Sequence, residues 1–403
     1  MSSNAVGAQR YVAIHEMVGD PKVIPPTPAM QKLLTSGDTL ASSPIFVEGE
    51  NFSSNRIKEP GRYIRDDVQG DISFDLVSLF SGADNPLLVA ALWADAWRNT
   101  HDAGWDGLSL EGAVFTASGS TLNMTGAVNL ANFTITDYDE FRIRGTANGN
   151  DAIYQLVETG TGTNIYTVTP AVTADETCGA AVLMDGRTIN NGETAHNFLI
   201  ERGHVDINEY LVFLGMVANV LQVDIANETT VKASLSFIGR LEDDPSATPI
   251  TGATYTNEPT ANPIYSVNND TDIYLDGVLV ENCLFESLSF TVDNSAVGKS
   301  GAGVNGLCDV VGLTLNLSVS LTMAFQSTTY RQKMKNGTPF SLDFVLNGTD
   351  NSALKIKLPR IVLTSDSIPV SGPEDIIENA EGSAHADLAS GRGIQISEFP
   401  AYS

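Results

Sequence analysis

The sequence predicts an all-β fold, mainly an antiparallel sandwich or half-barrel, with one or two flanking helices and an inserted small β-domain. Two observations carry this prediction. Apolar and polar residues alternate along several segments, and a period of two is typical of strands with one buried face. The polar positions hold mainly Ser, Thr, Asn, Asp and Lys, whereas parallel strands read as continuous apolar runs.

The segment 312–325, GLTLNLSVSLTMAF, is the clearest of these strands. Its apolar residues from Leu313 to Phe325 fall on one side and its Thr, Asn and Ser residues on the other. At ~3.3 Å per residue, a strand over 313–325 would be about 43 Å long, so we expect long partners. The same alternation occurs at 71–76, 231–237, 284–292 and 354–358.

Changes in residue composition and in the length of the alternating segments divide the chain into three parts. We expect residues 1–106 and 194–403 to form one parent fold, and residues 107–193, rich in Gly, Thr and Asn with short strands, to form an outward-facing insertion. A capping Asp84 and Pro86 predict a helix that runs to Trp97.

Two segments of the parent fold show little alternation. Residues 1–45 hold scattered prolines, and residues 240–269 form a long Pro-rich loop. We expect both to lack a core of their own and to become ordered against a neighbouring chain.

Charge and composition exclude several classes of function. A formal net charge of −27 argues against binding nucleic acid through phosphate contacts, which need clustered Lys and Arg. Three cysteines without a CxxC spacing imply neither a disulfide framework nor a zinc site. The first residues, MSSNAVGAQRYVAIHEM, do not show a basic region followed by an apolar core, and no run approaches the ~18 apolar residues of a membrane span, so we expect synthesis in a cytoplasm.

Enzyme motifs are incomplete. Val297-Gly298-Lys299-Ser300 resembles the end of a phosphate loop, but Asp293 stands where the first glycine is required. Asp270, Asp272 and Asp276 resemble part of a calcium loop without its closing glutamate. A glycosidase pair of carboxylates stays open as a minor alternative, because such pairs meet in space rather than in sequence. We expect no catalysis, no cofactor and no metal.

Short motifs occur in a fixed order along the parent fold. They are His15–Asp20, Gly70–Leu76, Phe198–Arg202, Gly215–Leu221, Ser289–Asn294, Asp309–Gly312 and Lys357–Arg360. In this order the chain resembles the major tail tube proteins of long, non-contractile-tailed (siphovirus-type) bacteriophages. The insertion is similar to accessory domains that some members carry, although no motif in it matches.

The resemblance implies a structural virion protein of the phage tail, made in the bacterial host cytoplasm. It implies hexameric rings that stack into a tube, with about four strands per subunit in one lumenal barrel. Implied partners are further copies of the chain and the tail terminator, tape measure and distal tail proteins, while genomic double-stranded DNA passes without specific binding. About 24 strands at ~4.8 Å and a tilt of ~45° leave an opening of about 40 Å, wide enough for a ~20 Å duplex.

Two sets of residues are candidates for these roles. The candidates for the lumen are Asp71, Ser73, Asp75, Ser287, Asn316, Ser318 and Ser320. The candidates for contacts between stacked rings are Glu242, Pro245, Pro249, Tyr255, Pro259 and Pro263. The alternative for the first set is the outer surface of an ordinary β-sandwich. The alternative function for the whole chain is a carbohydrate-binding or adhesive surface protein, which aromatic residues gathered on one exposed loop set would favour.

Overall fold

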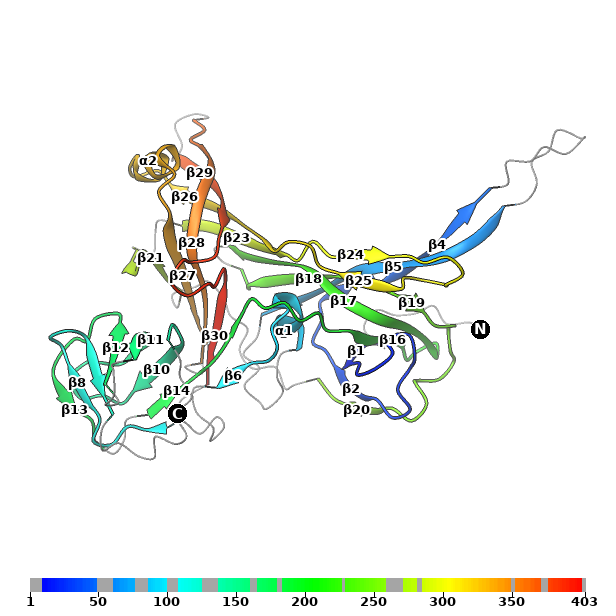
Figure 1. The fold of residues 1–403 in the computed structure, drawn as a ribbon, viewed down its shortest axis with the longest axis horizontal. Helices are drawn as coiled ribbons and strands as arrows, with labels where there is room; N and C mark the ends of the chain where they lie inside the picture. Colours follow the sequence, from blue (N-terminus) through cyan, green and yellow to red (C-terminus); the bar gives the residue numbers. More distant parts are fainter. Residues whose placement is uncertain are drawn as a thin grey trace, which may run out of the picture.

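The structure is a computed structural model. It describes residues 9–48, 61–76, 86–99, 108–124, 137–159, 165–179, 183–226, 229–258, 271–280, 285–348, 352–370 and 376–400. Within these ranges it contains a large sheet, a separate smaller sheet, a two-stranded hairpin and two short helices (Figure 1). The all-β prediction is confirmed.

The large sheet holds most of the strands. They are β1 (Arg10–Glu16), β2 (Ala29–Lys32), β3 (Gly37–Asp38), β4 (Ala41–Val47), β5 (Arg62–Asp75), β6 (Arg98–Asn99), β15 (Arg187–Asn190), β16 (Phe198–His204), β17 (Glu209–Ala226), β18 (Lys232–Gly239), β19 (Leu241–Glu242), β20 (Thr254–Thr256), β21 (Thr271–Leu275), β22 (Val278–Leu279), β23 (Phe285–Asp293), β26 (Asn316–Ala324), β27 (Phe340–Asn347), β28 (Ala353–Ser367), β29 (Ile377–Ala384) and β30 (Gln395–Phe399).

Eight of these strands follow one another without interruption. Their order is β4, β5, β18, β17, β23, β26, β29 and β28, and each is antiparallel to its neighbours. In Figure 1 this run extends from the projecting β4–β5 hairpin at one end to β28 and β29 at the other. The alternation predicted for 71–76, 231–237 and 284–292 supplies one buried face along the run, with Ile72, Leu235 and Phe290 almost fully buried.

The smaller sheet is formed by the chain between α1 and β16. Its strands are β7 (Leu108–Ser109), β8 (Val114–Thr116), β9 (Thr121–Asn123), β10 (Glu140–Arg144), β11 (Ala152–Thr159), β12 (Ile165–Thr169), β13 (Glu176–Thr177) and β14 (Leu183–Asp185). It encloses its own apolar cluster, which includes Phe115, Phe141 and Tyr154. One of the short strands predicted for the insertion, Phe133-Thr134-Ile135, lies outside the described residues. β15, inside the expected range 107–193, pairs with β30 and β6 of the large sheet.

Two helices flank the large sheet, α1 (Pro86–Leu92) and α2 (Thr329–Asn336). The helix predicted to run to Trp97 therefore ends earlier. The backbone of Trp93 is left-handed, with φ of 50°, and its indole N–H donates to the carbonyl oxygen of Ala218 at 2.8 Å. The helix therefore ends before Trp93, and the hydrogen bond from Trp93 to Ala218 holds the end of α1 against β17.

The long strand predicted over 312–325 is shorter than expected. β26 begins at Asn316, opposite Asp293, where its partner β23 ends. Residues 313–315 have no strand beside them, and Leu313 is 70% exposed. The longest strands are instead β17, with 18 residues, and β28, with 15. The ends of these strands are set by where their partner strands end, and not by how far the alternation of apolar and polar residues continues.

The expectation that residues 1–45 and 240–269 lack a core of their own is wrong for the described parts. β1 pairs along its whole length with β16, and Val12, Ala13 and Ile14 are buried. Ile250 and Tyr255 pack on a second apolar cluster around Met30 and Leu199. These segments lack the alternation of apolar and polar residues because short runs of consecutive residues, such as 12–14, are buried within the subunit.

Candidate functional site

One face of the eight-strand run is polar. A row of directly opposed residues crosses six strands in the order Ser73, Ser234, Gln222, Thr291, Ser318 and Ser383. A second row crosses the same strands in the order Asp75, Lys232, Asp224, Ser289, Ser320 and Glu381. Since opposed residues in a sheet point to the same side, both rows lie on one surface.

We call this surface the polar face. It consists of Asp71, Ser73, Asp75, Gln222, Asp224, Lys232, Ser234, Ser236, Ser287, Ser289, Thr291, Asp293, Asn316, Ser318, Ser320, Thr322, Asn379, Glu381 and Ser383. All seven lumen candidates are among them. The structure therefore brings together residues from three segments that lie far apart in the chain.

Sequence reasoning missed the contribution of β17 and β29. Gln222 and Asp224 alternate with Leu221, Val223 and Ile225, a signal that was available but is hidden by the continuous apolar run before it. In β29 the buried positions hold Glu378, Ala380 and Gly382, so no apolar alternation marks the strand.

The charge of the polar face is predominantly negative. It carries five carboxylates, on Asp71, Asp75, Asp224, Asp293 and Glu381, and one ammonium group on Lys232. Lys232 lies directly opposite Asp75 on one side and Asp224 on the other. The one cation of this face is therefore flanked by two carboxylates in the strand register, and the face as a whole repels anions.

The remaining polar side chains are short. Thr322 Oγ1 donates to Asn379 Oδ1 at 3.2 Å, and Asn316 Nδ2 donates to Ser295 Oγ at 2.9 Å. Ser318 and Ser320 are exposed. Short hydroxyl and amide groups hold a layer of water without offering a cluster of cations to a phosphate.

Both helices lie on the other side of the sheet. The buried residues of α1 belong to the same apolar cluster as Ile72 and Leu321, and Tyr330 and Met334 of α2 pack against that cluster. The polar face is therefore free of both helices.

A family comparison identifies the class of protein. A family model described as phage tail tube protein matches residues 7–384. The chain belongs to the phage tail tube protein family. A search of curated proteins finds no match. Membership makes the chain a structural component of the virion that assembles with other tail proteins. The family description does not separate siphovirus-type tails from others, so that part of the resemblance stays a prediction.

The ring-contact candidates of this tail tube protein occupy different environments. Pro245 and Pro249 are exposed, and Pro259 and Pro263 lie outside the described residues. Glu242 is half-buried in β19, and burial raises the pKa of its carboxyl group.

Tyr255, another of these candidates, is fixed within the subunit. Its hydroxyl donates to Glu201 at 2.8 Å, and Glu201 is fully buried. The hydroxyl of Tyr11 also donates to Glu201 at 2.5 Å, and the backbone N–H of Ile250 donates at 2.9 Å. Three donors around one buried carboxylate hold the 240–258 loop against β1 and β16.

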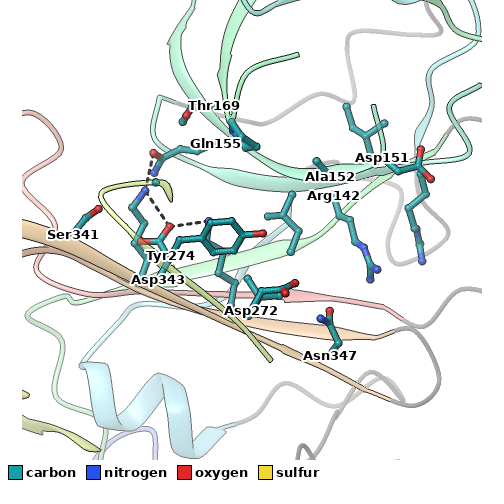
Figure 2. A pocket seen from close by; sticks show the side chains of 18 residues that line it. Arg142, Asp151, Ala152, Gln155, Thr169, Asp272, Tyr274, Ser341, Asp343 and Asn347 are labelled. Atoms are coloured by element: carbon teal, nitrogen blue, oxygen red, sulfur yellow. Dashed lines mark hydrogen bonds and ion pairs between the residues drawn. The ribbon is translucent and has the colours of Figure 1, made fainter. Parts of the chain in front are cut away.

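A cleft of about 490 Å³ separates β10 and β11 of the small sheet from β21, β27 and β28 of the large one (Figure 2). Lys355 Nζ lies 2.8 Å from Glu140 Oε1 and 3.1 Å from Asp343 Oδ2. Lys357 Nζ donates to Gln155 Oε1 at 2.9 Å. Burial opposes ionisation of Glu140, but Lys355 and Lys357 outweigh it and lower the pKa of Glu140. The Glu140–Lys355 ion pair and the Lys357–Gln155 hydrogen bond cross the cleft and join the two sheets.

The incomplete enzyme motifs have structural roles. Val297–Lys299 is β24, which pairs with β25 (Asp309–Val311). Asp276 and Gly277, with φ of 51° and 76°, form the tight turn between β21 and β22. Within the described residues, no three His, Cys, Asp or Glu side chains are grouped to hold a metal ion. Neither described helix is long and apolar enough to cross a membrane.

Proposed function

We propose that this chain is the repeating subunit of a tube of stacked, closed rings, and that the polar face lines the lumen through which double-stranded DNA passes during ejection. The observation that supports this most strongly is the continuity of the polar face across six strands, with five carboxylates, one lysine and neither helix upon it.

The chemistry of the polar face suits a conduit. Each contact between a phosphate and a Lys or Arg releases counterions and adds affinity, which a sliding duplex would have to break repeatedly. Carboxylates repel the phosphates, and hydroxyl groups keep the duplex surrounded by water. An acidic lumen therefore conducts DNA without binding it.

A ring of about 24 strands gives the required opening of about 40 Å. The resemblance to tail tube proteins implies six subunits with four strands each. In this proposal the tube ends against the tail terminator and distal tail proteins and encloses the tape measure protein before DNA passes. The exposed Pro245 and Pro249 of the 240–258 loop, with Glu242, are proposed contacts between rings.

The small sheet is proposed to be an inserted domain, between parent parts at 1–106 and 194–403, that faces away from the lumen. Its own apolar cluster supports independent packing. Its Glu140 pairs with Lys355 of β28, which does not belong to the polar face. A domain in this position leaves the channel open.

The proposal is tested by placing cations on the polar face. Ser318→Lys with Ser320→Lys adds two ammonium groups at exposed positions, and Ser318→Gln with Ser320→Gln adds similar length without charge. In phage carrying the lysine variant we expect tails of normal length and DNA ejection that is slowed at low salt, with the rate recovering as salt rises. The glutamine variant should eject normally. Equal ejection rates for all three proteins at low salt would remove this face from the lumen.

A further inference from the structure

The chain contains the same arrangement of strands twice. The first unit runs β5, α1, β16, β17, β18, with spatial order β16–β17–β18–β5. The second runs β26, α2, β27, β28, β29, with spatial order β27–β28–β29–β26. The helix lies against the long strand in both, α1 on β17 and α2 on β28. Outside this core, β1 pairs with β16 as β21 pairs with β27.

The two units also agree residue by residue. Val217 lies opposite Ile238 and Val362 opposite Ser383, and both members of the second pair are 145 positions later (362 − 217 and 383 − 238). The register shifts just after this point in both, from Ala218 in β17 and from Leu363 in β28. A register shift at the corresponding position of both strand pairs indicates that the two units are structural repeats of one another.

A second shift repeats as well. It falls between Phe198 and Ile200 in β16, and between Phe340 and Leu342 in β27. The small sheet is inserted after the helix of the first unit only. The eight-strand run is therefore two equivalent four-strand units, β4–β5–β18–β17 and β23–β26–β29–β28, with β3 continuing β4 along β5.

The two units are joined by one strand pair, in which the second half of β17 pairs with β23 from Val220 opposite Asp293 to Ala226 opposite Ser287. The equivalent edges at the outer ends of the run pair with no described strand. These are the edge of β28 beyond Ile361, on the side away from β29, and the edge of β4 on the side away from β5. Unpaired edges of this kind are templates for strand addition.

The repeat fixes the register of such a pairing. Ser73 lies opposite both Ser234 and Gly37, and Thr322 lies opposite both Asn379 and Ser287. β3 and β4 keep one register along β5, so counting from Gly37 through β3 into β4, and from Ser287 along β23, Ser43 corresponds to Asp293. Counting along β17 from Val217 and along β28 from Val362, Ser365 corresponds to Val220.

We propose that β28 of one copy pairs with β4 of a second copy in the register that β17 and β23 have within the chain, and that three copies close the ring. Ser365 then lies opposite Ser43, and Ser367 lies opposite Ala41. Ser365 Oγ donates to Glu381 Oε2 at 3.1 Å, so Ser365 borders the polar face. The register therefore extends that face from one copy to the next, and this inference rests on the proposed tube.

The number three follows from the strands that each copy contributes. Two copies would give 16 strands and an opening of about 25 Å, which leaves no room for water around a ~20 Å duplex. Three copies give 24 strands and the opening of about 40 Å. Each ring then has six equivalent units from three chains, in place of the six chains expected from the resemblance.

The experiment is crosslinking combined with mass measurement on the full chain. Cys283 and Cys308 are replaced with Ser, and Ser43→Cys with Ser365→Cys is treated with a short bis-maleimide after assembly. We expect covalent species of two and three chains, a ladder that stops at three, and rings of about 129 kDa, three times the chain mass of 42.9 kDa. Each single cysteine variant, and Ser43→Cys with Ser383→Cys one strand inward, should remain uncrosslinked.

Two results would overturn the inference. A ladder that reaches six chains, or rings of about 257 kDa, gives six copies of 42.9 kDa and restores the hexamer. Tubes that form while the Ser43 and Ser365 positions never crosslink show a different contact between copies. In both cases tubes are seen by electron microscopy and the proposed function survives, whereas a chain that forms neither rings nor tubes contradicts the function itself.

Discussion

Lys355 of β28 and Glu140 of β10 form a buried ion pair of 2.8 Å that joins the small sheet to the large one. Ser397 Oγ donates to the other oxygen of Glu140 at 2.7 Å, and Asp343 also contacts Lys355. Removing one partner leaves a buried charge without its counterion. We expect Lys355→Met to lower the free energy of unfolding by about 3–5 kcal/mol, measured by chemical denaturation.

The double variant Glu140→Gln with Lys355→Met is the control for this prediction. Because it removes both charges, its cost should be smaller than the sum of the two single costs. Additive costs would show that the pair does not couple the sheets.

Glu378 predicts a pH dependence of stability. It is almost fully buried, and this burial, with the charge of Asp366 beside it, raises the pKa of Glu378 to about 7. In the unfolded chain the group ionises near its ordinary value of 4.5. Between these values the folded state binds more protons, so the stability that this group contributes is present at low pH and is lost as pH rises toward 7.

Glu378→Gln should therefore raise the melting temperature more at pH 8 than at pH 5. Thermal unfolding of both proteins at the two pH values measures the difference. Equal shifts at pH 5 and pH 8 would mean that Glu378 is ionised in the folded state throughout.

Tyr255 predicts a local effect. Tyr255→Phe removes one of three donors to the buried Glu201 while keeping the ring that packs beside Tyr11 at a centroid distance of 5.9 Å. We expect a loss of about 1.5–3 kcal/mol in the free energy of unfolding, because the hydrogen bond is made to a charged acceptor. Pro249→Ala, at an exposed position of the same loop, should leave stability unchanged and is the matched control. Unchanged stability in Tyr255→Phe would place the anchor of the loop elsewhere.

Excision tests the domain division. A short Gly/Ser linker should replace residues 108–185 and leave β15 in place, since β15 pairs with β30 and β6. We expect soluble protein that still forms tubes of the same inner diameter. Insoluble protein or a changed bore would show that the small sheet belongs to the core. Excision through Ile189 should be more damaging, because it removes a strand of the large sheet.

Local alternation was enough to predict the all-β fold and one polar face. Ser318 and Ser320 could be assigned to the polar side of their strand because the residues on either side of them, Leu317, Val319 and Leu321, are apolar and are buried in the structure. The ends of strands could not be read in this way. Leu313 continues the alternation but has no partner strand. The pairing of β26 begins at Asn316 because its partner β23 ends at the opposite residue, Asp293.

The repeat could not be read from the sequence either. The equivalent strands β18 and β29 read KASLSFIG and IENAEGSA, and they share their pairing rather than their residues. The two helices also differ in burial. Helix α1 has six buried residues, and none of the residues described in α2 is buried. The two units therefore share their strand pairing, whereas their side chains are too different for the repeat to be recognised from the sequence.

The most direct measurement is a cryo-electron microscopy reconstruction of tubes grown from the purified protein. The account predicts a closed barrel with Ser73, Ser318 and Ser320 facing the tube axis, both helices outside the barrel, and an inner diameter of about 40 Å. A tube with Ser318 and Ser320 on its outer wall, or with the apolar side of the sheet around the axis, would contradict it.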